Sequence, residues 1–241
     1  MKKLTMHSKK IFVLLVVCFL IFCFAFIGVY STLTISTTPM KKYTIVIDAG
    51  HGGIDGGVVG YSGNVYESDV NLQFALKLGK LFSGHDFNVV YTRQDSGGLY
   101  QENAKNKKAD DMKKRISIIE SCNADIVISL HQNGFILPNQ RGITAFYKST
   151  QSASKDLACV LQERFQDKLN YARKEALVGD YYILNECSAV CVLIECGFLT
   201  NPEEEQLLID EQYQQEVCFQ IFTGTIKYLL TQNKLIDAIN G

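Results

Sequence analysis

The sequence lacks an excess of charge of either sign: 24 Lys and Arg residues balance 25 Asp and Glu residues, and the formal net charge is -1. It therefore gives no electrostatic reason to expect nucleic acid or an anionic surface as a partner. We find no long run of like charges, no internal repeat and no low-complexity tract. Hydrophobic residues make up 47% of the 241 residues, enough for one domain with a sizeable core plus an appendage.

The cysteines do not form a compact zinc-binding pattern. Six of the eight lie beyond the N-terminal region, and their spacing matches no zinc motif. These are Cys122, Cys159, Cys187, Cys191, Cys196 and Cys218. Several fall on apolar faces, so we expect small core residues. Their pairing in an exported protein cannot be read from the sequence.

The N-terminus differs from the rest of the chain. Four lysines within the first ten residues precede an uncharged apolar run at 11–29. A run of this length spans a bilayer, which needs about 20 such residues. The lysines favour an orientation with the N-terminus inside, which places the later residues outside the cytoplasmic membrane. The run is long for a cleaved signal peptide, so we favour an anchor, with secretion as the alternative if cleavage occurs.

The expected organisation is therefore a basic cytoplasmic flank at 1–10, a transmembrane anchor or signal segment at 11–30, a linker at 31–42 and one domain at 43–241. Within that domain, runs of β-branched and apolar residues alternate with segments of helical periodicity. Strands are expected at 43–48, 87–92, 125–130, 142–147, 190–195 and, as a short one, 182–184. Helices are expected at 67–82, 110–122, 154–170, from 202, and at 212–230.

This alternation predicts an α/β fold, with a mostly parallel twisted sheet and helices on both faces. Asn201, Pro202 and Glu204 are typical of a helix start, with Asn201 as the cap and Glu204 completing a capping box. In such sheets ligands bind beyond the carboxyl ends of the strands. The residues that follow the strands are therefore the candidates for a functional site.

Two of the four histidines follow strands directly. His51 comes after the first expected strand and His131 after the third, so both reach the same rim of the sheet. His7 lies in the N-terminal flank, and His85 lies in a helix-to-strand turn, where a solvated side chain is expected. The rim histidines are thus the two that a site can use.

Two carboxylates reach the same rim. Glu67 begins the first expected helix, and Glu195 ends a continuously apolar strand, where an unpaired buried charge is costly. Two imidazoles and one carboxylate make a zinc site with an open position, and a second carboxylate can accept and return a proton. The spacing allows either glutamate to be the ligand. The simpler alternative is two rim histidines beside unrelated, salt-bridged glutamates.

These residues lie in segments that resemble the zinc-dependent N-acetylmuramoyl-L-alanine amidases, the amidase-3 family. The matching segments are IDAGHGG at 47–53, ESDVNL at 67–72, TR at 92–93, SLHQN at 129–133 and IECGFLTN at 194–201. Five segments in this order, each at an expected strand or helix end, are a specific signal. The resemblance covers nearly all of the exported part.

The resemblance implies the roles that spacing left open. His51, Glu67 and His131 are then the ligands of one Zn²⁺ per chain, and Glu195 is the catalytic carboxylate. The implied reaction is hydrolysis of the amide between N-acetylmuramic acid and L-alanine in peptidoglycan. Arg93 and Asn133 also match family positions, and we interpret them as residues that shape the site.

A narrower resemblance points to the germination-specific, spore-cortex branch of the family. It rests on residues 98–100, 106–108 and 111–115 and on the plan of one anchor and one domain without wall-binding repeats. It implies removal of stem peptides so that muramic δ-lactam forms in the cortex, at a cytoplasmic or forespore membrane. An accessory activating protein is plausible, although no motif indicates one. The alternative for this stretch is a solvated basic loop leading into a helix.

Two other functions compete with this hypothesis. A different zinc-dependent cell-wall peptidase would need a subsite for a peptide carboxylate, and no distinctive pair of arginines provides it. A catalytically inactive peptidoglycan-binding module would not need all four site residues, yet all are present. The sequence departs from the family pattern at Val190, Cys191 and Cys196. We expect Cys196 to pack in the core, because strand alternation points it away from Glu195.

Overall fold

The computed structural model describes residues 15–19, 42–169 and 171–240, and the chain divides into two units, Met1–Lys41 and Lys42–Gly241. The expected flank and linker, with His7, lie outside the described residues apart from Lys42. Of the expected anchor, a short helix at 15–19 is described. Among the helices described, none has both the length and the apolar character needed to cross a membrane.

The second unit is built on a six-stranded sheet in the described part of the chain, in the order β2-β1-β3-β6-β4-β5. The strands are β1 (Thr44–Ala49), β2 (Asn88–Tyr91), β3 (Ile126–Asn133), β4 (Thr144–Tyr147), β5 (Leu177–Val178) and β6 (Val190–Phe198). The sheet is mixed, because β4 pairs antiparallel with β6 while the other neighbours pair in parallel. The α/β class is confirmed in this mixed form.

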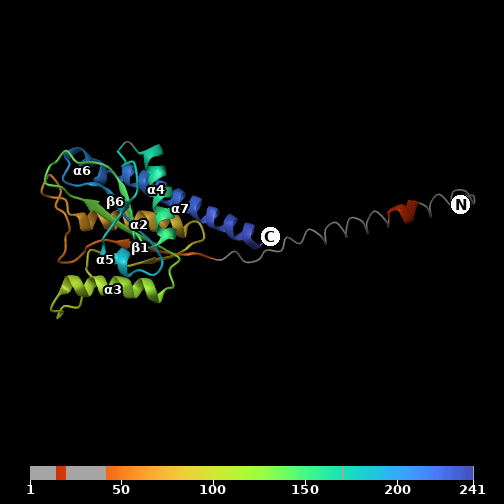
Figure 1. Cartoon of the computed structure of the whole chain (residues 1–241), viewed down its shortest axis with the longest axis horizontal. Coiled ribbons are helices and arrows are strands. Elements are labelled where there is room, and N and C mark those ends of the chain that lie inside the picture. The colour runs from red at the N-terminus through yellow and green to blue at the C-terminus, as the bar shows by residue number, and fades with distance from the viewer. Residues whose placement is uncertain (1–14, 20–41, 170, 241) are drawn as a thin grey trace, which may run out of the picture. The chain divides into compact units, whose positions relative to one another are not determined.

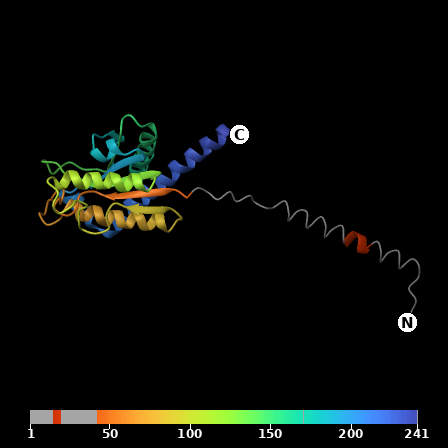
Figure 2. The ribbon, with the colours of Figure 1, turned by 90° about the horizontal axis from the view of Figure 1, so that it is seen from below.

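Helices cover both faces of the sheet. They are α2 (Glu67–Ser83), α3 (Lys107–Ser121), α4 (Ser152–Lys168), α5 (Tyr182–Glu186), α6 (Pro202–Ile209) and α7 (Glu211–Asn240). The larger core joins α2, α4 and α7 to one face, and a smaller core joins α3 and α5 to the other. Figure 1 shows α3 and α5 away from α4 and α7, and Figure 2 shows α2 and α3 on opposite sides of β1.

The helical periodicity read from the sequence accounts for α2. Val70, Phe74 and Leu78 recur at intervals of four, and all three are buried in the larger core. Full burial of such side chains stabilises the fold by about 1.5–3 kcal/mol each. Asp69 lies in the first turn, where the helix dipole favours negative charge. Packing on the sheet therefore fixes α2, and with it Glu67 at its first position.

Two local predictions are wrong. The short strand expected at 182–184 is part of α5, and the extra edge strand is instead β5. Asn201 does cap α6, since its side chain accepts from the backbone N–H groups of Glu203 and Glu204. The Glu204 carboxylate, however, accepts from the N–H groups of Phe198 and Gly142, so there is no capping box. Tertiary donors outcompete the local one for this carboxylate.

Candidate active site

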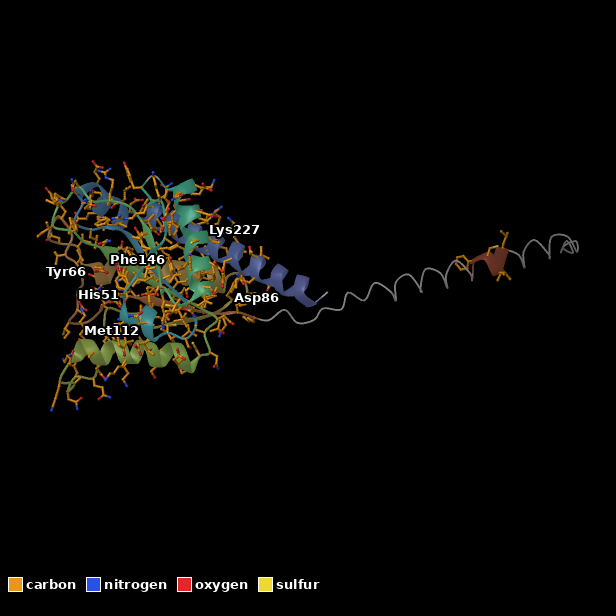
Figure 3. All side chains as sticks on the ribbon, in the orientation of Figure 1. His51, Tyr66, Asp86, Met112, Phe146 and Lys227 are labelled. Carbon is orange, nitrogen blue, oxygen red and sulfur yellow. The ribbon has the colours of Figure 1, made fainter. Side chains whose placement is uncertain are left out.

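The carboxyl ends of β1, β3 and β6 bring the predicted residues together. These three strands are parallel neighbours, and His131 pairs with Glu195 across β3 and β6. Figure 3 shows His51 at one end of the domain with Tyr66, while Asp86 lies at the opposite end. The rim predicted from the carboxyl ends of the strands is therefore a real feature of the fold.

His51, Glu67 and His131 form a compact cluster. Nε2 of His51 lies 3.2 Å and Nδ1 of His131 lies 3.0 Å from Oε1 of Glu67. One ligand atom from each residue lies within 4.8 Å of the other two, so the cluster can hold a metal ion. The two imidazole rings meet edge to face, with centroids 5.0 Å apart. Both nitrogens thus converge on one carboxylate.

Glu67 is fixed by backbone donors as well as by the histidines. Its Oε2 accepts from the N–H of Val58 at 2.8 Å, and its Oε1 accepts from the N–H of Gln132 at 3.1 Å. Burial by itself would raise the pKa of Glu67, but hydrogen bonds and charge from His131 and His51 bring it well below its usual value. The carboxylate is consequently an anion, which is the form that binds a cation.

Asp55 supports His51 from the other side. Its Oδ2 lies 3.0 Å from Nδ1 of His51, at ion-pair distance but without the geometry of a hydrogen bond, and Nε2 faces the cluster. Burial would lower the pKa of His51, but Glu67 and Asp55 together raise it. A carboxylate on the outer nitrogen is the usual way of orienting a metal-binding histidine. Sequence analysis missed Asp55, because the fold of the Gly-rich loop that brings it back to His51 has no periodic signal.

Glu195 differs from Glu67 in its surroundings. It is 7% exposed, and its Oε2 is buried without a hydrogen-bond partner among the described residues. Burial raises its pKa to about 7, although the nearby imidazole of His131 opposes the rise. A carboxyl group with a pKa near neutrality is suited to accept and return a proton. The unpaired oxygen is therefore available to a water molecule or a substrate group.

Tyr181 is a neighbour of Glu195 that sequence analysis also missed. It is the residue before α5, and its ring packs edge to face on Phe146 of β4, with centroids 5.4 Å apart. Burial and the charge of Glu195 raise the pKa of its hydroxyl to about 12, so the phenol keeps its proton. Because this segment was assigned to a strand, its role at the rim was not visible in the sequence.

A cavity of about 540 Å³ joins these groups, since all four predicted site residues and Tyr181 line it. Asn133 lines the cavity too, whereas Arg93 is not among the lining residues. Arg93 donates to the backbone oxygens of Ala49, Gly50, Ser68 and Asp95. It therefore holds the loop after β1, in agreement with the shaping role predicted for it.

The remaining histidine and the cysteines behave as expected. His85 is exposed, and its Nδ1 contacts the carbonyl of Leu81 at 2.7 Å. Cys187, Cys191, Cys196 and Cys218 are buried free thiols. Cys196 lies in the larger core, on the face opposite Glu195. These four cysteines thus contribute to packing, and no cysteine of the described residues joins the cluster.

Comparison with known proteins decides the family. Residues 45–227 match the family described as N-acetylmuramoyl-L-alanine amidase, Amidase_3. The chain belongs to this family. The amidase is 32% identical over 196 residues to the germination-specific N-acetylmuramoyl-L-alanine amidase of Bacillus subtilis (strain 168), a match that covers 79% of this chain and 81% of that protein.

Solved structures support the same assignment. The amidase is similar to the CwlD amidase from Clostridioides difficile, determined in complex with the GerS lipoprotein, with a TM-score of 0.75, 35% identity and coverage of 79% of this chain and 100% of that one. An N-acetylmuramoyl-L-alanine amidase from Clostridium difficile 630 matches with a TM-score of 0.71, 33% identity and coverage of 78% and 97%. The predicted family and its germination-specific branch are confirmed.

Proposed function

We propose that this amidase hydrolyses the amide between N-acetylmuramic acid and L-alanine with one Zn²⁺ held by His51, Glu67 and His131, and with Glu195 as the catalytic carboxylate. One observation carries the proposal. An anionic carboxylate between two imidazoles and a second carboxylate of raised pKa line the same cavity. Ligand set and proton acceptor are thus provided by different groups.

The donor set fits zinc. Two imidazole nitrogens and one carboxylate oxygen are a common catalytic zinc set, which leaves a position open to water or substrate. When bound there, Zn²⁺ polarises the substrate carbonyl and lowers the pKa of a bound water. Since Oε1 of Glu67 already faces both imidazoles, little rearrangement of the side chains is needed.

Glu195 supplies the proton transfers. In the proposed reaction, its Oε2, which has no hydrogen-bond partner among the described residues, accepts the proton of the attacking water. The same oxygen then passes the proton to the nitrogen of L-alanine, so that the amine leaves in its neutral form. Burial favours this role, because it disfavours the charged carboxylate and so raises the proton affinity of Glu195 above that of an exposed glutamate. Tyr181 and His131 border this carboxylate and set its environment.

The relatives support a role in the spore cortex, where stem-peptide removal allows muramic δ-lactam to form. One relative is named germination-specific, and a similar structure was determined with a lipoprotein partner. We infer that this amidase also acts in the cortex and that an accessory protein assists it. The apolar run at 11–29 supports a domain anchored outside the cytoplasmic or forespore membrane.

The test compares two glutamine variants. Glu195→Gln keeps shape but cannot accept a proton, so it should retain zinc and lose turnover by about a hundredfold or more. Glu67→Gln replaces an anionic ligand with a weak neutral one, so it should lose zinc first and regain activity in excess zinc. Zinc content and amide cleavage are measured for both across added zinc. If zinc rescues Glu195→Gln and not Glu67→Gln, the roles are exchanged.

A further inference from the structure

The segment that carries the spore-cortex resemblance surrounds the loop of His51. The hydroxyl of Tyr100 accepts from the N–H of Ile54 at 3.0 Å, and Nζ of Lys108 lies 3.2 Å from Oδ2 of Asp55. The first of these contacts joins Tyr100 to the loop backbone, and the second joins Lys108 to the carboxylate beside His51. Lys108 remains largely exposed, so this stretch is solvated as the alternative expects, while two of its side chains also reach the His51 loop.

Arg115 is the buried member of this segment. Its side chain is 1% exposed and distributes its donors over four groups. Nε donates to Asp111 at 2.6 Å, and Nη1 donates to Asp48 at 2.6 Å and to the Ala49 carbonyl at 2.7 Å. Nη2 donates to the carbonyl of His51 at 2.6 Å. The guanidinium thus connects α3, β1 and the backbone of a residue of the metal-binding cluster.

The backbone of His51 needs such support. Its φ is 60°, in the left-handed region that residues other than glycine rarely adopt. The preceding Gly50 lies so close to His131 that a Cβ there would be 2.3 Å from the imidazole. The chain therefore turns sharply between β1 and His51, and this turn directs Nε2 toward Glu67. A relaxed backbone would move that nitrogen away from the cluster.

We propose that Arg115 is a positioning residue that holds His51 in its left-handed conformation and so sets the metal affinity of the cluster. The proposal rests on the proposed function only in that the cluster binds zinc. Two charged anchors, Asp48 and Asp111, fix the guanidinium, and its free edge holds the His51 carbonyl. Within the described part of the chain, Arg93 donates to the carbonyls of Ala49 and Gly50 but makes no hydrogen bond to the His51 carbonyl.

A lysine cannot replace this arrangement. The planar guanidinium offers donors in a rigid fork, whereas an ammonium is a point charge with donors at a single nitrogen. Arg115→Lys preserves the charge between Asp48 and Asp111 but cannot serve both of them and the His51 carbonyl together. The variant therefore keeps the positive charge beside Asp48 and Asp111 but removes the hydrogen bond to the His51 carbonyl.

The experiment measures metal affinity in the full-length protein, purified in mild detergent and stripped with a chelator. Zn²⁺ affinity is determined by competition with a chromogenic chelator, and ligand geometry is followed by the visible absorption of added Co²⁺. The control is Thr92→Val, which removes a 2.7 Å hydrogen bond to the same Asp48 carboxylate but does not touch His51. Circular dichroism and thermal unfolding of the metal-free forms show how far each change disturbs the fold.

Arg115→Lys should bind Zn²⁺ about 10–100-fold more weakly than wild type, the usual effect of removing a residue that orients a metal ligand. Its Co²⁺ spectrum should also differ from that of wild type. Thr92→Val should lower stability but keep both affinity and spectrum. Unchanged affinity in Arg115→Lys, or an equal loss in both variants, overturns the proposal. If wild type itself binds no Zn²⁺, the proposed function fails as well.

A second variant covers the case in which Arg115→Lys does not fold. Asp111→Asn keeps the guanidinium but weakens the anchor that orients Nε. It should also weaken Zn²⁺ binding, by less than the lysine variant, because the contact with His51 remains possible. Wild-type affinity and an unaltered Co²⁺ spectrum in folded Asp111→Asn overturn the proposal in that case.

Discussion

Replacing Glu195 with Gln should make the metal-free protein increasingly stable relative to wild type as the pH rises, in addition to its effect on catalysis. Burial raises the pKa of this carboxyl group from 4.5 to about 7. Its contribution to folding stability is therefore fully present below about pH 4.5 and is lost as the pH rises through about 7. Above that range the folded protein holds a desolvated charge that the unfolded chain hydrates freely.

The shift sets the size of the effect. At about 1.4 kcal/mol for each unit of pKa shift, the loss across the window is about 3 kcal/mol. The buried amide of Gln has the same cost at every pH, so it cancels when two pH values are compared. The advantage of Glu195→Gln over wild type should grow by about 2.5 kcal/mol between pH 5 and pH 8, because part of the loss has already occurred at pH 5. For a domain of this size, that corresponds to roughly 5–10 °C in Tm.

The assay is urea unfolding of chelator-treated wild type, Glu195→Gln and a surface control at both pH values. Glu203→Gln is the control, because its carboxylate is exposed and paired with Arg141 at the surface. Its difference from wild type should stay within about 0.5 kcal/mol at both pH values. A difference between Glu195→Gln and wild type that does not change with pH would refute the reasoning. Added Zn²⁺ should shrink the difference, because a nearby cation favours the carboxylate.

Three further results are expected. Elemental analysis should find one zinc per chain in wild type and much less in His51→Ala and in His131→Ala. Full zinc content in both variants would show that these histidines are not the metal ligands. Tyr181→Phe should keep zinc but move the acidic limb of the pH profile of kcat/KM to higher pH. In wild type the Tyr181 hydroxyl lowers the pKa of Glu195, so its removal raises that pKa; an unchanged profile would exclude this role. Protease added to intact protoplasts should digest the domain, and survival until lysis would show that the orientation is wrong.

The parts of the fold that were predictable are those with a periodic signal. The spacing of Val70, Phe74 and Leu78 predicted α2, and strand ends placed His51 and His131 on one rim. Strand alternation also placed Cys196 on the face opposite Glu195. These features follow from local geometry, which a single sequence records.

The parts that were missed depend on contacts between distant segments. Arg115 and Asp48 are 67 positions apart, and their pairing exists only once α3 packs on β1. The segment that contains Tyr181 has no clear periodicity, so a short apolar run was assigned to a strand instead of α5. The antiparallel pairing of β4 with β6 likewise joins residues that are distant in the sequence, such as Thr144 and Glu195. The sequence motifs identified the proposed ligands but not the residues that support them.

The central claim is that this chain cuts the amide between muramic acid and L-alanine with a bound metal. The most direct test digests purified cortex or vegetative peptidoglycan with the full-length protein, with and without a chelator, and identifies the fragments by mass spectrometry. The account predicts two products, stem peptides with a free L-alanine amino terminus and glycan chains that keep the lactyl carboxylate. Both should form only when no chelator is present. Cleavage within the peptide or the glycan, or the same products in the presence of chelator, would contradict it.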